Sequence, residues 1–147
     1  MKKIMIILAL VFTVTTSFAA IGEESVNQQA LNAFQSEFAG ASDAVWTVGS
    51  DYYKVTFTFS DQKLFAFYNN QGEFLAVSRY ISSFQLPIHL QTGLKRSYSS
   101  YWISDLFEMS NNDETSYYVT LENADTKIVL KSTDGRDWIP YKKNKKA

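Results

Sequence analysis

A short apolar pattern occurs once in each half of this chain. The segment YKVTF (Tyr53–Phe57) is matched by YYVTL (Tyr117–Leu121). Each copy follows a short amphipathic segment and precedes a second apolar run that ends in a turn, at Gly72 or Gly135. Repetition of this kind indicates that one small structural unit is used twice, which constrains the fold more than any single motif does.

The first unit begins with a helix. Ser25 is a candidate N-cap, and apolar residues then recur at helical spacing as far as Phe38. Gly40 and the polar residues after it end this helix. Tight turns rich in Gly, Asn, Asp and Ser separate the segments that follow. These segments are predicted strands: Ala44–Val48, Tyr52–Phe59, Lys63–Tyr68 and Phe74–Tyr80.

The second unit repeats this order. Leu86-Pro87 opens a short helix that extends to Tyr98, because proline is tolerated in a first helical turn. The predicted strands are Tyr101–Met109, Thr115–Glu122, Lys127–Lys131 and Arg136–Tyr141. The four lysines that follow are expected to form a disordered basic tail that is dispensable for folding.

Short helices and strands joined by tight turns predict an antiparallel sheet. In the strand Tyr52–Phe59, apolar residues alternate with polar ones, so one face of the sheet is expected to lie under the helix. The predicted fold class is α+β: two tandem helix–antiparallel-sheet repeats form one two-layer domain, with the helices on one face of the sheet.

The N-terminus has the pattern of an export signal. Lys2 and Lys3 precede an apolar core, Ile4–Val14, and small residues at Ser17 and Ala19 mark a cleavage site. This apolar core is too short for a membrane anchor. We therefore predict a signal peptide over 1–19 and a single domain over 20–147, made of repeat one at about 25–82, repeat two at about 85–141 and the basic tail 142–147. The expected location is the periplasm or the cell exterior.

Composition excludes several classes of function. The chain has no cysteine, so disulfides, thiolate nucleophiles and zinc–cysteine sites are ruled out. Residues 20–141 contain eight Lys and Arg against fifteen Asp and Glu, a net charge of −7. This acidic body argues against a nucleic-acid partner.

No catalytic constellation is apparent in the sequence. His89 is the only histidine, so a histidine metal cluster cannot form, and any catalytic triad would need His89 as its base. We expect no metal and no cofactor. His89 is interpreted as a residue of the first helical turn, and a weak hydrolase that uses His89 remains an alternative.

Aromatic side chains are the remaining candidates for function, because Tyr and Trp are common at binding hot spots. From the predicted alternation, a set of side chains is expected to face away from the core and to form a contact surface: Tyr52, Lys54, Thr56, Tyr68, Tyr118 and Thr120. A register slip of one residue would invert this list.

These patterns resemble a known family. The first repeat carries Phe34-x3-Phe38, Ala44-x-Trp46, the Tyr53–Phe57 strand and the Asn70-Gln71-Gly72 turn. The second carries Leu86-Pro87, Tyr98, Ile103, the Tyr117–Leu121 strand and Asp134-Gly135. Together they resemble the PepSY-like, β-lactamase-inhibitor-like exported proteins of bacteria. The resemblance implies tandem helix-plus-sheet units, export and no established enzymatic activity.

The function predicted from sequence is an exported, non-enzymatic binding module. It would recognise a protein or peptide of the cell envelope or exterior through an open sheet face. A second alternative is an inhibitor of an exported peptidase or β-lactamase. The oligomeric state is left open.

Overall fold

A computed structural model describes residues 20–146, and the predicted signal peptide lies outside the described residues. Two short 3-10 turns, at Glu23–Ser25 and Ser83–Gln85, precede the two α-helices, α2 (Gln28–Glu37) and α3 (Ile88–Ser97). The strands are β1 (Ala20–Ile21), β2 (Ser42–Val48), β3 (Tyr52–Phe59), β4 (Gln62–Asn69), β5 (Phe74–Tyr80), β6 (Trp102–Ser110), β7 (Thr115–Glu122), β8 (Thr126–Ser132) and β9 (Ile139–Lys145).

The strands are hydrogen-bonded in the order in which they occur along the chain, from β1 to β9. Six strand pairs are antiparallel: β1–β2, β2–β3, β3–β4, β6–β7, β7–β8 and β8–β9. The predicted α+β class with an antiparallel sheet is therefore confirmed. The chain divides into two compact units within β5, with unit 1 ending at Val77 and unit 2 beginning at Ser78.

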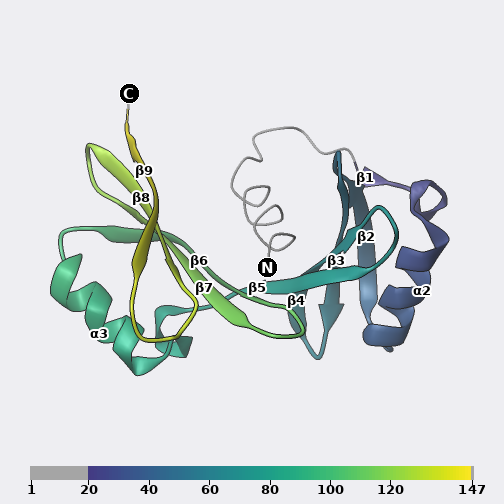
Figure 1. The fold of residues 1–147 in the computed structure, drawn as a ribbon, viewed down its shortest axis with the longest axis horizontal. Helices are drawn as coiled ribbons and strands as arrows, with labels where there is room; N and C mark the ends of the chain where they lie inside the picture. Colours follow the sequence, from purple (N-terminus) through teal and green to yellow (C-terminus); the bar gives the residue numbers. More distant parts are fainter. Residues whose placement is uncertain (1–19, 147) are drawn as a thin grey trace. The chain divides into compact units, whose positions relative to one another are not determined.

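In unit 1 the helix α2 covers one face of the sheet (Figure 1). Ala30 and Phe34 on α2 are buried against Trp46, Val55 and Phe57. The rings of Phe34 and Phe57 meet edge-on with their centroids 4.9 Å apart. Burial of large rings of this kind is the main source of stability in a domain without disulfides.

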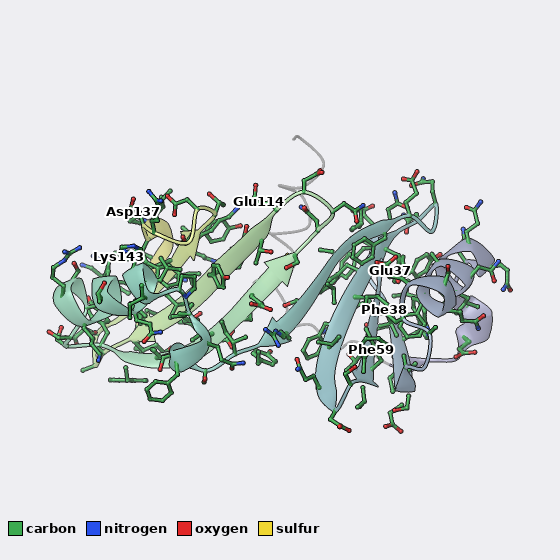
Figure 2. All side chains as sticks on the ribbon, turned by 90° about the horizontal axis from the view of Figure 1, so that it is seen from below. Glu37, Phe38, Phe59, Glu114, Asp137 and Lys143 are labelled. Atoms are coloured by element: carbon green, nitrogen blue, oxygen red, sulfur yellow. The ribbon has the colours of Figure 1, made fainter. Side chains whose placement is uncertain are left out.

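The end of α2 is held by a second pair of rings. Phe38, the C-cap residue, packs against Phe59 on β3 with ring centroids 5.8 Å apart, and Figure 2 shows the two side by side. At the other end, the Asn27 side chain accepts a hydrogen bond from the Gln29 backbone N–H at 2.7 Å and so caps the helix. The expected cap, Ser25, lies instead in the 3-10 turn that precedes it.

The turn between β4 and β5 requires glycine for two reasons. Gly72 has a φ of +83°, and a Cβ at this position would lie 2.5 Å from the backbone nitrogen of Ala30 in α2. Asn27 adds a hydrogen bond from its side chain to the Asn70 carbonyl oxygen. The start of α2 is therefore in direct contact with the turn that ends β4.

In unit 2 the helix α3 packs on one face of its own strands (Figure 1). Leu90 and Leu94 are buried against a group of apolar side chains: Leu106, Val119, Leu121, Ile128 and Leu130. Trp138 lies at the edge of this core, and its indole N–H donates to the Leu90 carbonyl oxygen at 3.0 Å. That bond links the segment before β9 to α3.

The end of the chain corrects two predictions. The last strand is Ile139–Lys145, not Arg136–Tyr141, so three of the four lysines expected in a disordered tail belong to β9. Lys142 and Lys143 pair with Val129 and Ile128 of β8. Ile139 at the start of β9 is 60% exposed. Backbone pairing does not depend on side-chain polarity, so an exposed edge strand with three lysines among its seven residues forms without apolar alternation.

Lys146 continues this pairing past the strand. Its backbone N–H donates to the Asp125 carbonyl oxygen at 2.8 Å, and its Nζ donates to the Asn123 carbonyl oxygen at 2.8 Å. The same Nζ lies 3.7 Å from a Glu122 carboxylate oxygen and 4.8 Å from the centre of the Trp102 ring. The basic segment thus contacts the acidic body of the protein. Figure 2 labels Lys143 on this strand.

Truncation of the chain after Tyr141 should therefore lower its stability. Loss of the β8–β9 backbone hydrogen bonds beyond this point should reduce the free energy of unfolding by about 1–3 kcal/mol, at about 1 kcal/mol for each bond lost. Urea denaturation measures the change. The matched control, a Lys142→Gln/Lys143→Gln variant, keeps the backbone ladder and should unfold at nearly the wild-type midpoint. An unchanged midpoint after truncation would contradict the pairing of β9.

Candidate binding surface

The face of the unit 2 sheet opposite α3, here called the helix-free face, carries a row of aromatic rings. Tyr80 on β5, Phe107 on β6, Tyr118 on β7 and Tyr141 on β9 follow one another across it. Their centroids are 6.5 Å apart for Tyr80–Phe107, 5.0 Å for Phe107–Tyr118 and 6.1 Å for Tyr118–Tyr141. We refer to these four residues as the aromatic row.

Strand register places the row on this face. Phe107 pairs with Tyr118, whereas the neighbouring pair, Leu106 with Val119, lies in the core under α3. Successive side chains of a strand point to opposite faces, so Phe107 and Tyr118 point away from the helix. Lys131, which pairs with Tyr118 on β8, holds its Nζ 5.6 Å from the centre of the Tyr118 ring.

The inner and outer rings of the row differ in exposure. Phe107 and Tyr118 are buried, while Tyr80 is 64% and Tyr141 38% exposed. Burial, and next the neighbouring Tyr141, raise the pKa of Tyr118, so its phenol stays protonated well into the alkaline range. The inner rings therefore form a rigid, stacked base, and the outer rings present apolar surface with a hydroxyl at its edge.

Unit 1 has a smaller counterpart on the face opposite α2. Tyr52 packs against Phe67 with ring centroids 6.1 Å apart, and the Lys54 Nζ lies 4.9 Å from the centre of the Phe65 ring. Burial, together with the nearby Lys63, lowers the pKa of Lys54. Thr56 pairs with Phe65 and is half-buried.

Of the six residues predicted for a contact surface, two are partly exposed and four are buried. Lys54 and Thr56 are half-buried on the face opposite α2. Tyr52 is 5% exposed, because its ring lies over Gly49, where a Cβ would be 2.3 Å from a ring carbon. Tyr118 and Thr120 are also buried, in the middle of unit 2. The four buried side chains, two in each unit, are therefore not part of an exposed contact surface.

Tyr68 corrects the predicted register of β4. It pairs with Tyr53 and packs against Trp46, with ring centroids 5.8 Å apart, in the core under α2. The prediction that it faces away from the core is wrong. The middle of β4 is apolar on both faces, because Phe65 and Phe67 lie on one face and the apolar residues next to them lie on the other. The sequence therefore contains no polar alternation that could fix the register of this strand.

The outer rings of the row were missed because strand ends carry weak signals. Tyr80 is the last residue of β5, and Tyr141 lies in β9, which has no apolar alternation. A correct register for β5 to β9 would have shown that the aromatic residues of these strands lie in one row.

His89 lies in the first turn of α3 and its side chain is exposed. Its carbonyl oxygen accepts a hydrogen bond from the Thr92 hydroxyl at 3.0 Å. Within residues 20–146 no group of three or more acidic, histidine or cysteine side chains is placed to hold a metal ion. In the same part of the chain, no helix combines the length and the apolar character needed to cross a membrane.

Comparison with solved structures identifies the fold. A BLIP-like protein from Bacteroides fragilis superposes with a TM-score of 0.70 at 18% identity, over 82% of this chain and 86% of that one. DUF2874 family proteins from Bacteroides uniformis and Bacteroides ovatus both superpose with a TM-score of 0.72, at 13% and 14% identity. These cover 82% of this chain and 89% and 88% of theirs.

The chain has the fold of these BLIP-like and DUF2874 proteins. No family model matches its sequence, and no curated protein matches it. At such low identity the likeness concerns the fold alone, because one fold hosts many functions. The BLIP-like part of the resemblance seen in the sequence is thus supported at the level of fold.

Tyr68 offers a test of this core. Its hydroxyl and the Trp46 indole N–H are buried and have no hydrogen-bond partner among the described residues. Replacement of a buried, unpaired hydroxyl by hydrogen is nearly neutral or stabilising. The free energy of unfolding of Tyr68→Phe should therefore lie within about 1 kcal/mol of the wild-type value at pH 7. Urea denaturation measures this. A loss above about 2 kcal/mol would show that the hydroxyl has a partner.

The same variant tests how the stability of the protein changes at alkaline pH. Burial, with a smaller effect of Glu37, raises the pKa of Tyr68 above its ordinary value of 10.0. Above pH 10 the unfolded chain loses this proton while the folded protein keeps it, so stability falls as the pH rises. Tyr68→Phe should therefore lose less stability than wild type between pH 9 and about pH 11. Equal losses would contradict the burial of this phenol.

Proposed function

We propose that this protein is an exported, non-enzymatic binding module that recognises a protein or peptide through the helix-free face of unit 2. The observation that carries the proposal is the aromatic row, whose outer rings, Tyr80 and Tyr141, are exposed on a buried base formed by Phe107 and Tyr118. Aromatic residues held rigidly in this way are typical of binding hot spots, because little conformational entropy is lost when a partner covers them.

Further apolar side chains support the choice of this face. Ile139 pairs with Lys131, which itself pairs with Tyr118, so register places Ile139 on the same face as the row. It is 60% exposed. Trp102, which pairs with Glu122 at the start of β6, is 52% exposed beside Lys146. Exposed apolar side chains gathered on one face mark interaction sites more often than scattered ones do.

A hydrolase that uses His89 is less well supported, because no serine or carboxylate side chain among the described residues hydrogen-bonds to its imidazole. The geometry of the described residues supplies no general-base pair.

Inhibition of an exported peptidase or β-lactamase is a special case of the same proposal. The specific motive is the likeness of fold to a BLIP-like protein. Titration of such enzymes with this protein separates an inhibitor from a general binding module.

We also propose that the protein is exported, with cleavage near Ala19, to the periplasm or the cell exterior. We propose as well that it is related to PepSY-like proteins, and that its two units descend from one duplicated helix–sheet unit with both helices on one face.

Loss of the two outer rings tests the proposal. A Tyr80→Ala/Tyr141→Ala variant should bind the partner, captured from an envelope fraction by the wild-type protein, at least about tenfold more weakly, as expected when hot-spot rings are truncated. Surface plasmon resonance measures the affinity. The fold should be retained because both rings are exposed.

Phe84→Ala is the matched control. Phe84 is 87% exposed in the 3-10 turn before α3, outside the sheet, so its loss removes a comparable apolar surface from elsewhere in unit 2. This variant should bind like wild type. Equal affinities for wild type and the Tyr80/Tyr141 variant, or a loss confined to Phe84→Ala, would contradict the proposed face.

A further inference from the structure

A cleft opens in unit 2 beside the exposed end of the aromatic row. Its volume is about 340 Å³. The end of β5, the turn after it and the start of β6 line it through Tyr80, Ile81, Ser82, Ser83, Ile103, Ser104, Asp105 and Leu106. Its wall therefore combines one carboxylate, one phenol ring, aliphatic side chains and hydroxyls.

Asp105 carries the only carboxylate in this lining. Its side chain is half-buried, and the Leu106 backbone N–H donates a hydrogen bond to it. Within residues 20–146 no Lys or Arg nitrogen lies within ion-pair distance of it, and Lys127 pairs instead with Glu122 at 3.5 Å. Burial raises the pKa of Asp105, against the smaller opposing effects of the Leu106 N–H and of Lys127. A half-buried carboxylate without a cation is costly to maintain.

A β-bulge brings Asp105 into the cleft. The register of β6 shifts between Ile103 and Asp105, so Ser104 is an extra residue, and its hydroxyl bonds to the Thr120 carbonyl oxygen at 3.4 Å. Bulges redirect the side chains that flank them and are common beside functional sites.

Unit 1 shows that the fold does not require an acid at this position. There β2 is also bulged, and Val45 pairs with Thr56 where Asp105 pairs with Thr120. The next pairs, Trp46 with Val55 and Leu106 with Val119, are core pairs in both units. Valine, 47% exposed, thus occupies in unit 1 the place that the carboxylate takes in unit 2.

We infer that the Asp105 cleft receives the guanidinium group of an arginine side chain from a bound protein or peptide. Arginine suits this wall in three ways. Its planar group forms paired hydrogen bonds with a carboxylate, it stacks on a ring such as Tyr80, and its aliphatic stem packs on residues such as Ile103. A metal ion needs several oxygen ligands, and this lining offers one carboxylate. This inference rests on the proposed function and specifies one contact of the partner.

Titration with a minimal peptide tests the cleft without knowledge of the partner. The probe is acetyl-Gly-Arg-Gly-amide, and its control has citrulline, a neutral analogue of the same shape, in place of arginine. Nuclear magnetic resonance of the ¹⁵N-labelled protein should show saturable shifts at the amides of Tyr80–Ser83 and Ile103–Leu106. The citrulline peptide should bind at least about tenfold more weakly, because the charged hydrogen bonds are lost.

Two protein variants complete the test. Asp105→Val places the residue of unit 1 in the cleft and should fold, as its amide spectrum will show, yet lose the arginine-dependent shifts. Asp61→Asn makes the same change of charge at an exposed turn, where φ is 60° and asparagine is well tolerated, and should keep them. No saturable shift up to about 50 mM arginine peptide, equal binding of the citrulline peptide, or unchanged shifts in Asp105→Val would overturn the inference.

The outcome is independent of the partner experiment. Arginine-dependent shifts with no effect of Tyr80→Ala/Tyr141→Ala on partner capture would retain the cleft and refute the proposed face. Loss of capture in that variant with no arginine-dependent shift would retain the face and refute the cleft.

Discussion

The rest of the structure depends on the packing of a single helix against one face of the sheet within each unit. In unit 1 this is the contact of Phe34 with Trp46 and Phe57, and in unit 2 it is the contact of Leu90 and Leu94 with the apolar side chains of β6 to β8. Because strand side chains alternate, every residue that the helix does not cover points to the other face. Apolar side chains on that face shield one another, are exposed to water or are covered by another molecule.

In unit 2 the sheet fills its helix-free face only in part. Phe107 and Tyr118 stack and shield each other, while the ends of the row at Tyr80 and Tyr141 are left exposed. The bulge in β6 adds a half-buried carboxylate next to Tyr80. A face built from rigid rings with one acid at its edge is well suited to an apolar segment of a partner that carries an arginine.

The sequence was sufficient to predict the class of fold, and β3, β5 and β7 occur with the predicted bounds. These strands have tight polar turns at their ends, and β3 and β7 also alternate clearly between apolar and polar residues. The side chains of β4 were placed wrongly because both of its faces are apolar. The end of the chain was placed wrongly because β9 is held by backbone pairing, to which lysine side chains give no clue.

The candidate site was harder to predict than the fold. The alternation of β7 directed attention to Tyr118, but exposure depends on neighbours distant in sequence, and Phe107 and Tyr141 cover that ring. The most direct test of the helix-free face is photo-crosslinking from a benzoylphenylalanine placed at position 80 or, in a second variant, at position 84. We expect position 80 to form a covalent adduct with one envelope protein and position 84 to form none. Adducts formed equally from both positions, or from position 84 alone, would contradict the account.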